Sequence, residues 1–446
     1  MSRITHVLKR TGAVVPFNKQ RIATAVYQAA VAVGGRDREL AEAIADRVVQ
    51  VLEDRSPQDH VPTVEEIQDV VEKVLIESGH ARTAKAYILY RDERARRRRE
   101  RAGRSQQPSD HIPWAKLWEA LDWAVAHDLL TIAQLNERIA QGEYPQIVRE
   151  TDHFYIEDVT TSAEMIRGRR GQVRLVIIAG PSASGKTTTT LKLSHLLREA
   201  GIGLVPLNLD NYFFDLELHP RDEFGDYDFE TPQALDLDLI NRHLKQLLAG
   251  EKVTVPFYNF RTGRRHDART PMAIQPEDMI LIDSLHGLYP DMTAGIQDDL
   301  KFRLYVEPLL QMKGPQDDYI RWADLRLMRR MVRDAVFRAY DPQRTLAHWH
   351  YVRKSELRNI IRYASTADYI INTGLPYELP VMRARLFEPF EGWMEEYRDD
   401  PLRRDAYERA ERIYRLLEAV TEVRDESSIP PDSLLREFIG GSCYDY

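Results

Sequence analysis

The feature that most constrains this chain is an apolar run that leads into a glycine-rich loop and then into a helical pattern. The run covers residues 175–179 and is typical of a buried parallel strand. The loop that follows, Gly180-Pro-Ser-Ala-Ser-Gly185-Lys186-Thr187, fits the spacing G-x-x-x-x-G-K-[ST] at every fixed position. Residues 188–200 then carry leucines in a helical pattern. Strand, loop and helix in this order predict a phosphate-binding loop (P-loop) in an α/β fold.

The fixed residues of this loop predict its chemistry. Gly180 and Gly185 allow the backbone to curl so that its N–H groups face phosphate oxygens, and the N-terminus of the following helix adds positive potential. Lys186 would reach the terminal phosphates of ATP, and the Thr187 hydroxyl would ligate Mg²⁺. We therefore expect ATP and Mg²⁺ as cofactors. The loop residues expected to bind ATP are Gly180, Ser182, Ala183, Ser184, Gly185, Lys186, Thr187 and Thr188.

Length and composition exclude several classes of protein. A chain of 446 residues allows two or three domains with cores of their own. The single cysteine, Cys443, excludes an internal disulfide framework and a cysteine-based metal site. We find no apolar run of membrane-spanning length and no signal-peptide core, so we expect a cytoplasmic protein without membrane contact. A formal net charge of -8 does not favour indiscriminate binding to nucleic acid.

The first 95 residues carry a different pattern, a short hairpin followed by helices. Residues 5–17 predict two strands with a turn near Gly12. Helices are then expected at residues 18–35, near 38–53, from the capping box of Thr63 and Glu66 to about Gly79, and from about residue 81.

This block resembles the ATP-cone, a regulatory nucleotide-binding module of ribonucleotide reductases and some kinases. The residues that carry the resemblance are Val7-Leu-Lys9-Arg10-Thr-Gly12, Pro16-Phe17, Arg21-Ile22 and Ala84-Lys-Ala-Tyr87-Ile-Leu-Tyr90-Arg91. The resemblance implies that Lys9, Arg10 and Arg21 contact phosphates, and it also assigns Tyr87 and Arg91 to this site. The family usually has Asp at the place of Thr11 and often Lys at that of Arg21. The alternative is a module that has lost its ligand and serves in oligomer contacts.

Two segments separate this block from the P-loop. Residues 96–112 predict a polar linker, and residues 113–170 a helical bridging segment without a catalytic motif. Eight arginines stand at positions 91, 94, 96, 97, 98, 99, 101 and 104. No aromatic residues are interleaved, which favours a solvated helix end over an RNA or acidic-partner patch, although the stretch from Arg91 to Arg104 leaves nucleic acid open.

Two carboxylates follow predicted strands downstream of the loop. Asp210 follows the apolar residues 202–209, and Asp283 ends the apolar residues 279–283. In an open α/β sheet the C-terminal ends of the strands face the ligand crevice. We predict that Asp210 accepts a proton from an acceptor hydroxyl and that Asp283 lies on the Mg²⁺ side of the site. Further apolar stretches complete a predicted parallel sheet flanked by helices.

A cluster of arginines predicts a cover for the site. Arg326, Arg329, Arg330 and Arg333 recur at three- and four-residue spacing, largely on one face of a helix. Such a face suits a lid that neutralises charge during phosphoryl transfer, so we predict that Arg329 and Arg333 are catalytic and that Arg338 contacts ATP. The alternative is a salt-bridged surface helix.

The chain from about residue 172 onward resembles the uridine kinase/phosphoribulokinase family of P-loop kinases, in particular its long bacterial uridine-kinase-like branch. The resemblance rests on the P-loop together with Leu209-Asp210-Asn-Tyr-Phe213, residues 220–230, Phe260-Arg-Thr-Gly-Arg-Arg265, residues 285–287, Arg329-Arg-Met-Val-Arg-Asp334 and Leu435-Arg-Glu-Phe-Ile-Gly-Gly441. It implies that Asp210 is the base and that Glu230 lies near sugar hydroxyls. The residues expected to bind the acceptor are Tyr212, Glu230, Tyr258, Phe260 and Arg265.

Two positions depart from the family pattern. Asp283-Ser284 stands where the family usually has Glu-Gly, which leaves open whether the metal contact runs through water. Gly263 stands near the place where better-known uridine kinases carry a histidine that helps to read the base, so the identity of the base stays open.

The patterns and resemblances together predict an ATP-dependent kinase. The expected acceptor is a small molecule, most simply the 5′-hydroxyl of uridine or cytidine, and the expected assembly is a homo-oligomer with ATP or dATP regulation at the cone. The alternatives are a phosphoribulokinase-like sugar or sugar-phosphate kinase and a nucleotide-sensing or RNA-associated ATP-binding protein. The expected domains are an ATP-cone at 1–95, the linker at 96–112, the bridging segment at 113–170, the kinase domain at 171–390 and a helical C-terminal extension at 391–446.

Overall fold

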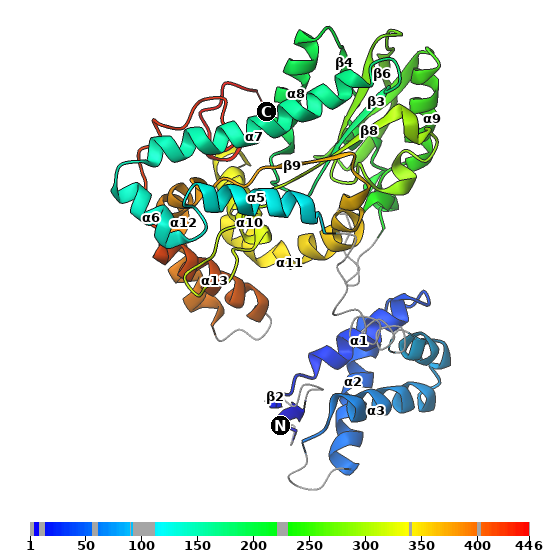
Figure 1. Ribbon diagram of the computed structural model, residues 1–446. Coiled ribbons are helices and arrows are strands. Elements are labelled where there is room, and N and C mark those ends of the chain that lie inside the picture. Colours follow the sequence, from blue (N-terminus) through cyan, green and yellow to red (C-terminus); the bar gives the residue numbers. More distant parts are fainter. Residues whose placement is uncertain are drawn as a thin grey trace. The chain divides into compact units, whose positions relative to one another are not determined.

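The computed structural model describes residues 4–8, 14–55, 61–89, 91, 112–220, 231–338, 341–398 and 403–445. The described residues fall into two compact units, one within residues 4–91 and one within residues 112–445 (Figure 1). Within these ranges no helix is both long enough and apolar enough to cross a membrane.

The first unit combines a β-hairpin with helices, as the sequence predicts. Its elements are the antiparallel strands β1 (His6–Leu8) and β2 (Val14–Pro16), helices α1 (Gln20–Val31), α2 (Arg38–Arg55) and α3 (Val64–Glu77), and a helical stretch at residues 81–89. The predicted capping box is present, since the Glu66 N–H donates to Thr63 Oγ1 at 3.1 Å and the Thr63 N–H donates to Glu66 Oε2 at 2.7 Å. Buried apolar residues from the three helices, among them Val26, Val48 and Val74, form the core of this unit.

The second unit is built on a five-stranded parallel sheet of order β4-β7-β3-β8-β9. The strands are β3 (Leu175–Ala179), β4 (Leu204–Pro206), β7 (Met279–Asp283), β8 (Lys301–Glu307) and β9 (Tyr369–Asn372). The P-loop strand β3 lies at the centre, which explains why all of its residues are apolar and buried. β4 is shorter than the predicted stretch of residues 202–209.

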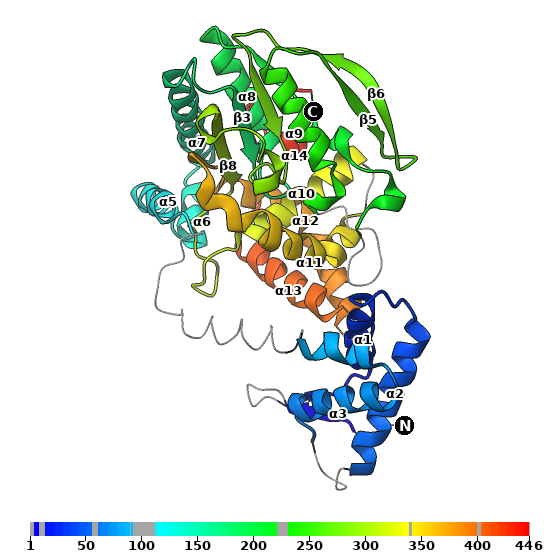
Figure 2. The ribbon, with the colours of Figure 1, turned by 90° about the vertical axis from the view of Figure 1, so that its right-hand side faces the viewer.

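Alternate residues of β3 pack into different cores on the two faces of the sheet. Val176 and Ile178 join a core with α7 (Tyr144–Gly168), α8 (Lys186–Glu199) and buried residues of the helices between residues 322 and 419. Leu175 and Ile177 join a second core with α9 (Leu237–Leu248) and strand β5 (Val253–Asn259), which pairs antiparallel with β6 (Arg264–Met272). Figure 2 shows this hairpin and α9 beside the sheet. The remaining helices are α5 (Trp114–Ala126), α6 (Ile132–Ala140), α10 (Trp322–Arg338), α11 (Pro342–Asn359), α12 (Glu378–Tyr397), α13 (Arg404–Ala419) and α14 (Arg436–Ile439).

The bridging helices are anchored to the edge of the sheet. Asp158 of α7 accepts hydrogen bonds from the backbone N–H of Asn372 at 2.9 Å and from the Tyr369 hydroxyl at 2.8 Å, both on β9. The same carboxylate pairs with Lys116 of α5. Helices α5 and α7 therefore belong to the same compact unit as the sheet.

Candidate active site

The P-loop joins β3 to α8 with a backbone that requires its glycines. Gly185 has a φ of +90° at the N-terminus of α8, in the left-handed region. A Cβ at Gly180 would lie 2.2 Å from the backbone oxygen of Val306 on the neighbouring strand β8. The loop therefore lies tightly over the end of the sheet, next to the first turn of α8, where the backbone N–H groups have no partner within the helix.

A cavity of about 760 Å³ opens beside the loop and above the ends of β4 and β7. The predicted site residues that line it are Ser182, Ala183, Ser184, Gly185, Lys186, Thr187, Asp210, Phe260, Asp283 and Arg333. The structure thus brings the loop, both predicted carboxylates and one predicted arginine around a single space, as expected where strand ends meet at one edge of a parallel sheet.

Lys186 lies at the centre of this arrangement. Its Nζ donates a hydrogen bond to the backbone oxygen of Pro181 at 3.0 Å, so the side chain folds back over its own loop. Burial lowers the pKa of Lys186, while the nearby carboxylates of Asp283 and Glu437 act in the opposite direction. The two carboxylates favour the protonated form of Lys186. They therefore help to keep the side chain positively charged at the place where phosphate groups would lie.

The two carboxylates occupy different surroundings. Asp283 is partly buried, and its Oδ2 accepts a hydrogen bond from Thr190 Oγ1 at 3.3 Å. Asp210 lines the cavity, and its backbone N–H donates to Asn208 Oδ1 at 2.9 Å. Burial raises the pKa of both carboxyls, and Asp283 raises that of Asp210 further. A carboxylate with a raised pKa is a better proton acceptor than an ordinary aspartate.

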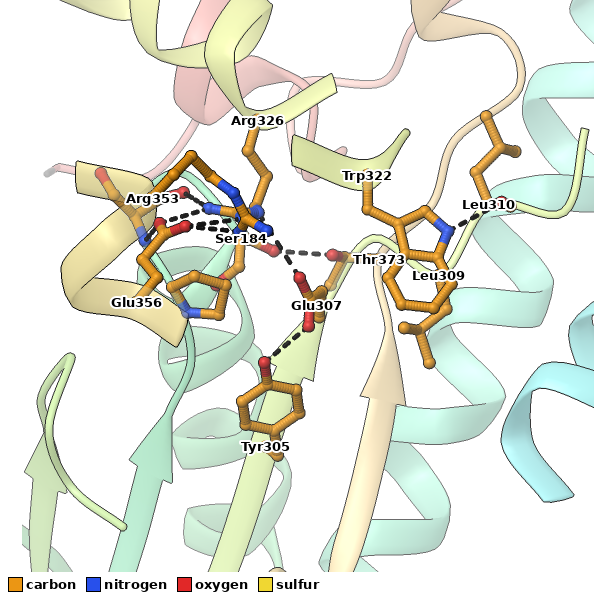
Figure 3. Close-up of polar contacts among 12 residues, drawn as sticks. Ser184, Tyr305, Glu307, Leu309, Leu310, Trp322, Arg326, Arg353, Glu356 and Thr373 are labelled. Atoms are coloured by element: carbon orange, nitrogen blue, oxygen red, sulfur yellow. Dashed lines mark hydrogen bonds and ion pairs between the residues drawn. The ribbon is translucent and has the colours of Figure 1, made fainter. Parts of the chain in front are cut away.

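The arginine cluster of α10 divides into two groups. Arg330 and Arg333 line the cavity; Arg330 donates to Ser182 Oγ at 3.3 Å. Arg326 and Arg329 are instead fully buried in ion pairs with Glu356 and Glu378 and do not line the cavity. Arg326 binds Glu356 at 2.5 and 2.9 Å (Figure 3). It also donates to the backbone oxygen of Ser182 and so helps to fix the P-loop.

The prediction that Arg329 is catalytic is wrong for this structure. Its guanidinium donates to both oxygens of Glu378, at 2.6 and 2.9 Å, and to the backbone oxygen of Thr373 at 2.6 Å. Arg329 does not line the cavity, because its face of α10 packs on α12 and the loop after β9. The arginines at three- and four-residue spacing do not share one function.

We expect Arg329→Ala to destabilise the fold by about 3–5 kcal/mol, because it would leave the carboxylate of Glu378 buried without its partner. Arg333→Ala is the matched control, since Arg333 lies on the same helix and lines the cavity. Urea unfolding of both variants measures the difference. Equal stability of Arg329→Ala and the wild type would show that the ion pair is not structural.

The predicted acceptor residues are only partly brought together. Phe260 lines the cavity, whereas Tyr258 is buried behind it with ring centroids 4.9 Å apart. Tyr212 is fully buried and bonds to His243 at 2.9 Å, and Arg265 is paired with Asp236 at 2.9 Å, so neither lines the cavity. The assignments of Tyr212, Tyr258 and Arg265 as acceptor-binding residues are therefore corrected. Glu230 and the side chain of Arg338 lie outside the described part of the chain.

The predicted cone residues are also only partly described. Lys9 and Arg10 lie outside the described residues. Arg21 is exposed on the first turn of α1. Arg91 is paired with Asp69 at 2.6 Å and Glu72 at 2.7 Å. Tyr87 is buried, which raises the pKa of its hydroxyl to about 12. Arg91 therefore already has two anionic partners within its own unit.

Several polar and aromatic residues of the cavity were not predicted to be site residues. Asn208, Phe213, Ser284, Thr190 and Glu437 all line it. Phe213 comes shortly after Asp210. The rule that the C-terminal ends of parallel strands face the ligand crevice could therefore have predicted that Phe213 lies at the site. Glu437 comes from α14, about 250 residues from the loop in sequence, and its spacing gives no signal of this position.

The residues of the cavity suit ATP and Mg²⁺. The Ser184 Oγ is buried without a hydrogen-bond partner among the described residues, so this loop hydroxyl has a hydrogen bond still to make. Thr187 is exposed at the start of α8 and Asp283 lines the same cavity, which gives oxygen ligands of the type Mg²⁺ prefers. The described residues contain no group of three or more His, Cys, Asp or Glu side chains able to hold a metal, so phosphate oxygens would have to complete the coordination.

The fold and this cavity define a phosphotransferase of the P-loop class. The model of the Phosphoribulokinase / Uridine kinase family matches residues 175–378, and that of the ATP cone domain matches residues 5–96. The chain belongs to the phosphoribulokinase/uridine kinase family and carries an N-terminal ATP cone domain. The family and the site together support a kinase that uses an alcohol group as acceptor.

Curated relatives match the two parts separately. A uridine kinase of Chloroflexus aurantiacus is 31% identical over 166 residues, which are 37% of this chain and 69% of the relative. A uridine kinase of Halobacterium salinarum is 30% identical over 161 residues, 36% of this chain and 62% of the relative. A vitamin B12-dependent ribonucleoside-diphosphate reductase of Thermoplasma acidophilum is 47% identical over 103 residues, 22% of this chain and 13% of the relative. The chain thus spans less than two thirds of the Halobacterium and Thermoplasma proteins.

Proposed function

We propose that this protein transfers the γ-phosphoryl group of ATP to the 5′-hydroxyl of a nucleoside, uridine or cytidine. The observation that carries the proposal is that Asp210 and Phe260 share one cavity with the P-loop. A carboxylate that can take the proton of a hydroxyl, and a ring on which a base can stack, therefore lie close to the residues that would hold the phosphates.

The side chains divide the work of the reaction. Lys186 and the N–H groups of the loop hold the donor phosphates. Thr187 and Asp283 would hold Mg²⁺, which would offset part of the phosphate charge. Asp210 accepts the proton as the acceptor oxygen bonds to the γ-phosphorus and the bond to the β-phosphate oxygen breaks. Arg333, and with it Arg330, offsets the charge that develops in transfer.

The acceptor side favours a neutral nucleoside over a sugar phosphate. Arg264 is paired with Asp215 and Glu217, and Arg265 with Asp236 and Asp267. Arg264 and Arg265, the first residues of β6, are thus engaged by carboxylates and do not line the cavity, so neither offers its charge to a phosphorylated acceptor there. Phe213 and Phe260, with ring centroids 5.8 Å apart, instead offer aromatic surface.

The experiment is a panel of nucleosides and sugar phosphates incubated with ATP–Mg²⁺, followed by the mass of each product. We expect phosphorylation of uridine or cytidine, and we expect Phe260→Ala to raise the acceptor KM roughly tenfold, as expected for loss of one base stack. Phe257→Ala is the control, because Phe257 is exposed on the same hairpin and does not line the cavity. Product only from a sugar or sugar phosphate would favour the phosphoribulokinase-like alternative, and no product with any acceptor would favour a nucleotide-sensing protein.

We further propose that the cone binds ATP or dATP as a regulatory ligand. Arg21 on the first turn of α1 places a cation where a helix N-terminus already favours anions. The 47% identity to part of a ribonucleotide reductase also supports a retained module. The homo-oligomer stays a prediction.

A further inference from the structure

The C-terminal tail reaches into the P-loop. Residues 433–439 are mostly buried, and the side chain of Leu434 lies so close to Gly185 that a Cβ there would approach it to 2.7 Å. The tail is fixed by an ion pair of Asp432 with Lys192 at 2.8 Å and by hydrogen bonds of Arg436 to the backbone oxygens of Glu426 and Ile429, both at 2.8 Å. The tail is therefore a fixed part of the structure around the P-loop.

Within the tail, Glu437 contacts the first turn of α8. Its Oε2 accepts a hydrogen bond from the backbone N–H of Thr188 at 3.0 Å and another from Thr188 Oγ1 at 2.7 Å. The N–H groups of a first helical turn have no partner within the helix and are the groups with which helix N-termini bind phosphate. The Glu437 carboxylate is itself an anion, so it occupies these donors as a phosphate group would.

We propose that Glu437 is a specificity-determining residue of the nucleotide site: its carboxylate occupies the Thr188 donors, and a nucleotide gains full contact with the loop only when that carboxylate swings away. This inference rests on the proposed function, in which the loop binds ATP. Two anions cannot share one pair of donors, and Glu437 lines the same cavity as Lys186 and Arg333. The negative charge of Glu437 therefore competes with phosphate for both cations.

The displacement needs only the Glu437 side chain to move. The anchors at Asp432 and Arg436 lie outside the contact with Thr188, and Phe438 is buried under the guanidinium of Arg329 with 5.2 Å to the ring centroid. The tail can thus stay docked while its carboxylate leaves the loop. A nucleotide that offers enough phosphate contacts would displace the carboxylate, whereas a nucleoside monophosphate, which cannot also reach Lys186, would not.

The test compares the Kd of ATP–Mg²⁺ by calorimetry for the wild type, Glu437→Gln, Glu437→Ala and two controls. Glu437→Gln keeps an acceptor for Thr188 but removes the charge, so we expect its Kd to fall roughly tenfold. Glu437→Ala should also bind ATP more tightly, and both variants should show a lower KM for ATP with an unchanged KM for the acceptor. Asp432→Asn, which weakens the tail anchor without touching the loop, should bind ATP as the wild type does.

Each outcome bears on one proposal. If neither Glu437 variant binds ATP more tightly, while Lys186→Ala loses the P-loop site, Glu437 serves only to cap α8 and the inference is overturned. If Lys186→Ala retains that site, the proposed function itself fails. Thermal unfolding shows whether a Glu437 variant has lost its fold. If one variant has, the Kd of ATP for the other variant tests the inference. Tighter binding in Asp432→Asn as well would assign the effect to docking of the tail and would also overturn the role of the carboxylate.

Discussion

Replacing Lys186 with alanine is expected to abolish measurable phosphoryl transfer and to leave the fold intact. Lys186 lies in a cavity that also holds the carboxylates of Asp210, Asp283 and Glu437. Without the lysine, donor phosphates would meet three carboxylates with one cation fewer, and the charge that develops in transfer would lose its nearest counterion. We expect the rate to fall by at least about 10³-fold, the upper end of what one buried donor contributes.

Calorimetry on the full chain separates this site from the cone. The wild type should bind ATP at two sites per protomer, and Lys186→Ala should keep one. Lys192→Ala is the matched control, because Lys192 lies on the same helix, pairs with Asp432 and does not line the cavity. Turnover at the wild-type rate in Lys186→Ala would show that the P-loop is not the active site. A single site in the wild type that is lost in Lys186→Ala would mean that the cone does not bind ATP.

Local patterns predicted the parts of this site that local structure determines. The P-loop could be predicted because its glycines serve a backbone shape that spans eight residues, confirmed by the φ of Gly185 and the contact of Gly180 with β8. The positions of Asp210 and Asp283 followed from one rule, that parallel strands end at the same edge of a sheet. Phe260 followed from the resemblance to the family.

The direction of each arginine on α10 could not be predicted in this way. Spacing places Arg326, Arg329, Arg330 and Arg333 near one another, but it does not say which of them meets a buried carboxylate. That depends on Glu356 of α11 and Glu378 of α12, which reach α10 only through tertiary packing. The same holds for Glu437, whose position on Thr188 depends on the path of the tail and not on its sequence.

The aromatic residues after Asp210 also show that the sequence does not predict where a side chain points, in this case for two adjacent residues. Phe213 lines the cavity, whereas its neighbour Tyr212 is buried under it and bonded to His243 of α9. Adjacent side chains of the short turn at Leu209–Tyr212 point in different directions. A resemblance that covers the whole segment cannot separate them.

Asp210→Asn is expected to lower phosphoryl transfer by roughly 10²-fold or more, because the amide keeps the shape of the carboxylate but cannot accept the proton. ATP binding should stay near the wild-type value, because Asp210 has no hydrogen bond with the P-loop in the described contacts. Single-turnover kinetics measure the rate, and calorimetry with ATP measures the binding. Asp215→Asn is the control, since Asp215 follows in the same segment and binds the backbone N–H of Arg265 instead.

The pH profile tests the same assignment independently. Burial and the charge of Asp283 raise the pKa of Asp210 above its ordinary value near 3.8, so kcat/KM should fall as the pH drops through that raised pKa. The loss has this sign because a protonated carboxyl can no longer take the proton of the acceptor. Asp283→Asn removes the neighbouring charge and should shift this acid limb to lower pH, whatever it also costs in metal binding. An acid limb that persists unchanged in Asp210→Asn, together with transfer at the wild-type rate, would exclude Asp210 as the base.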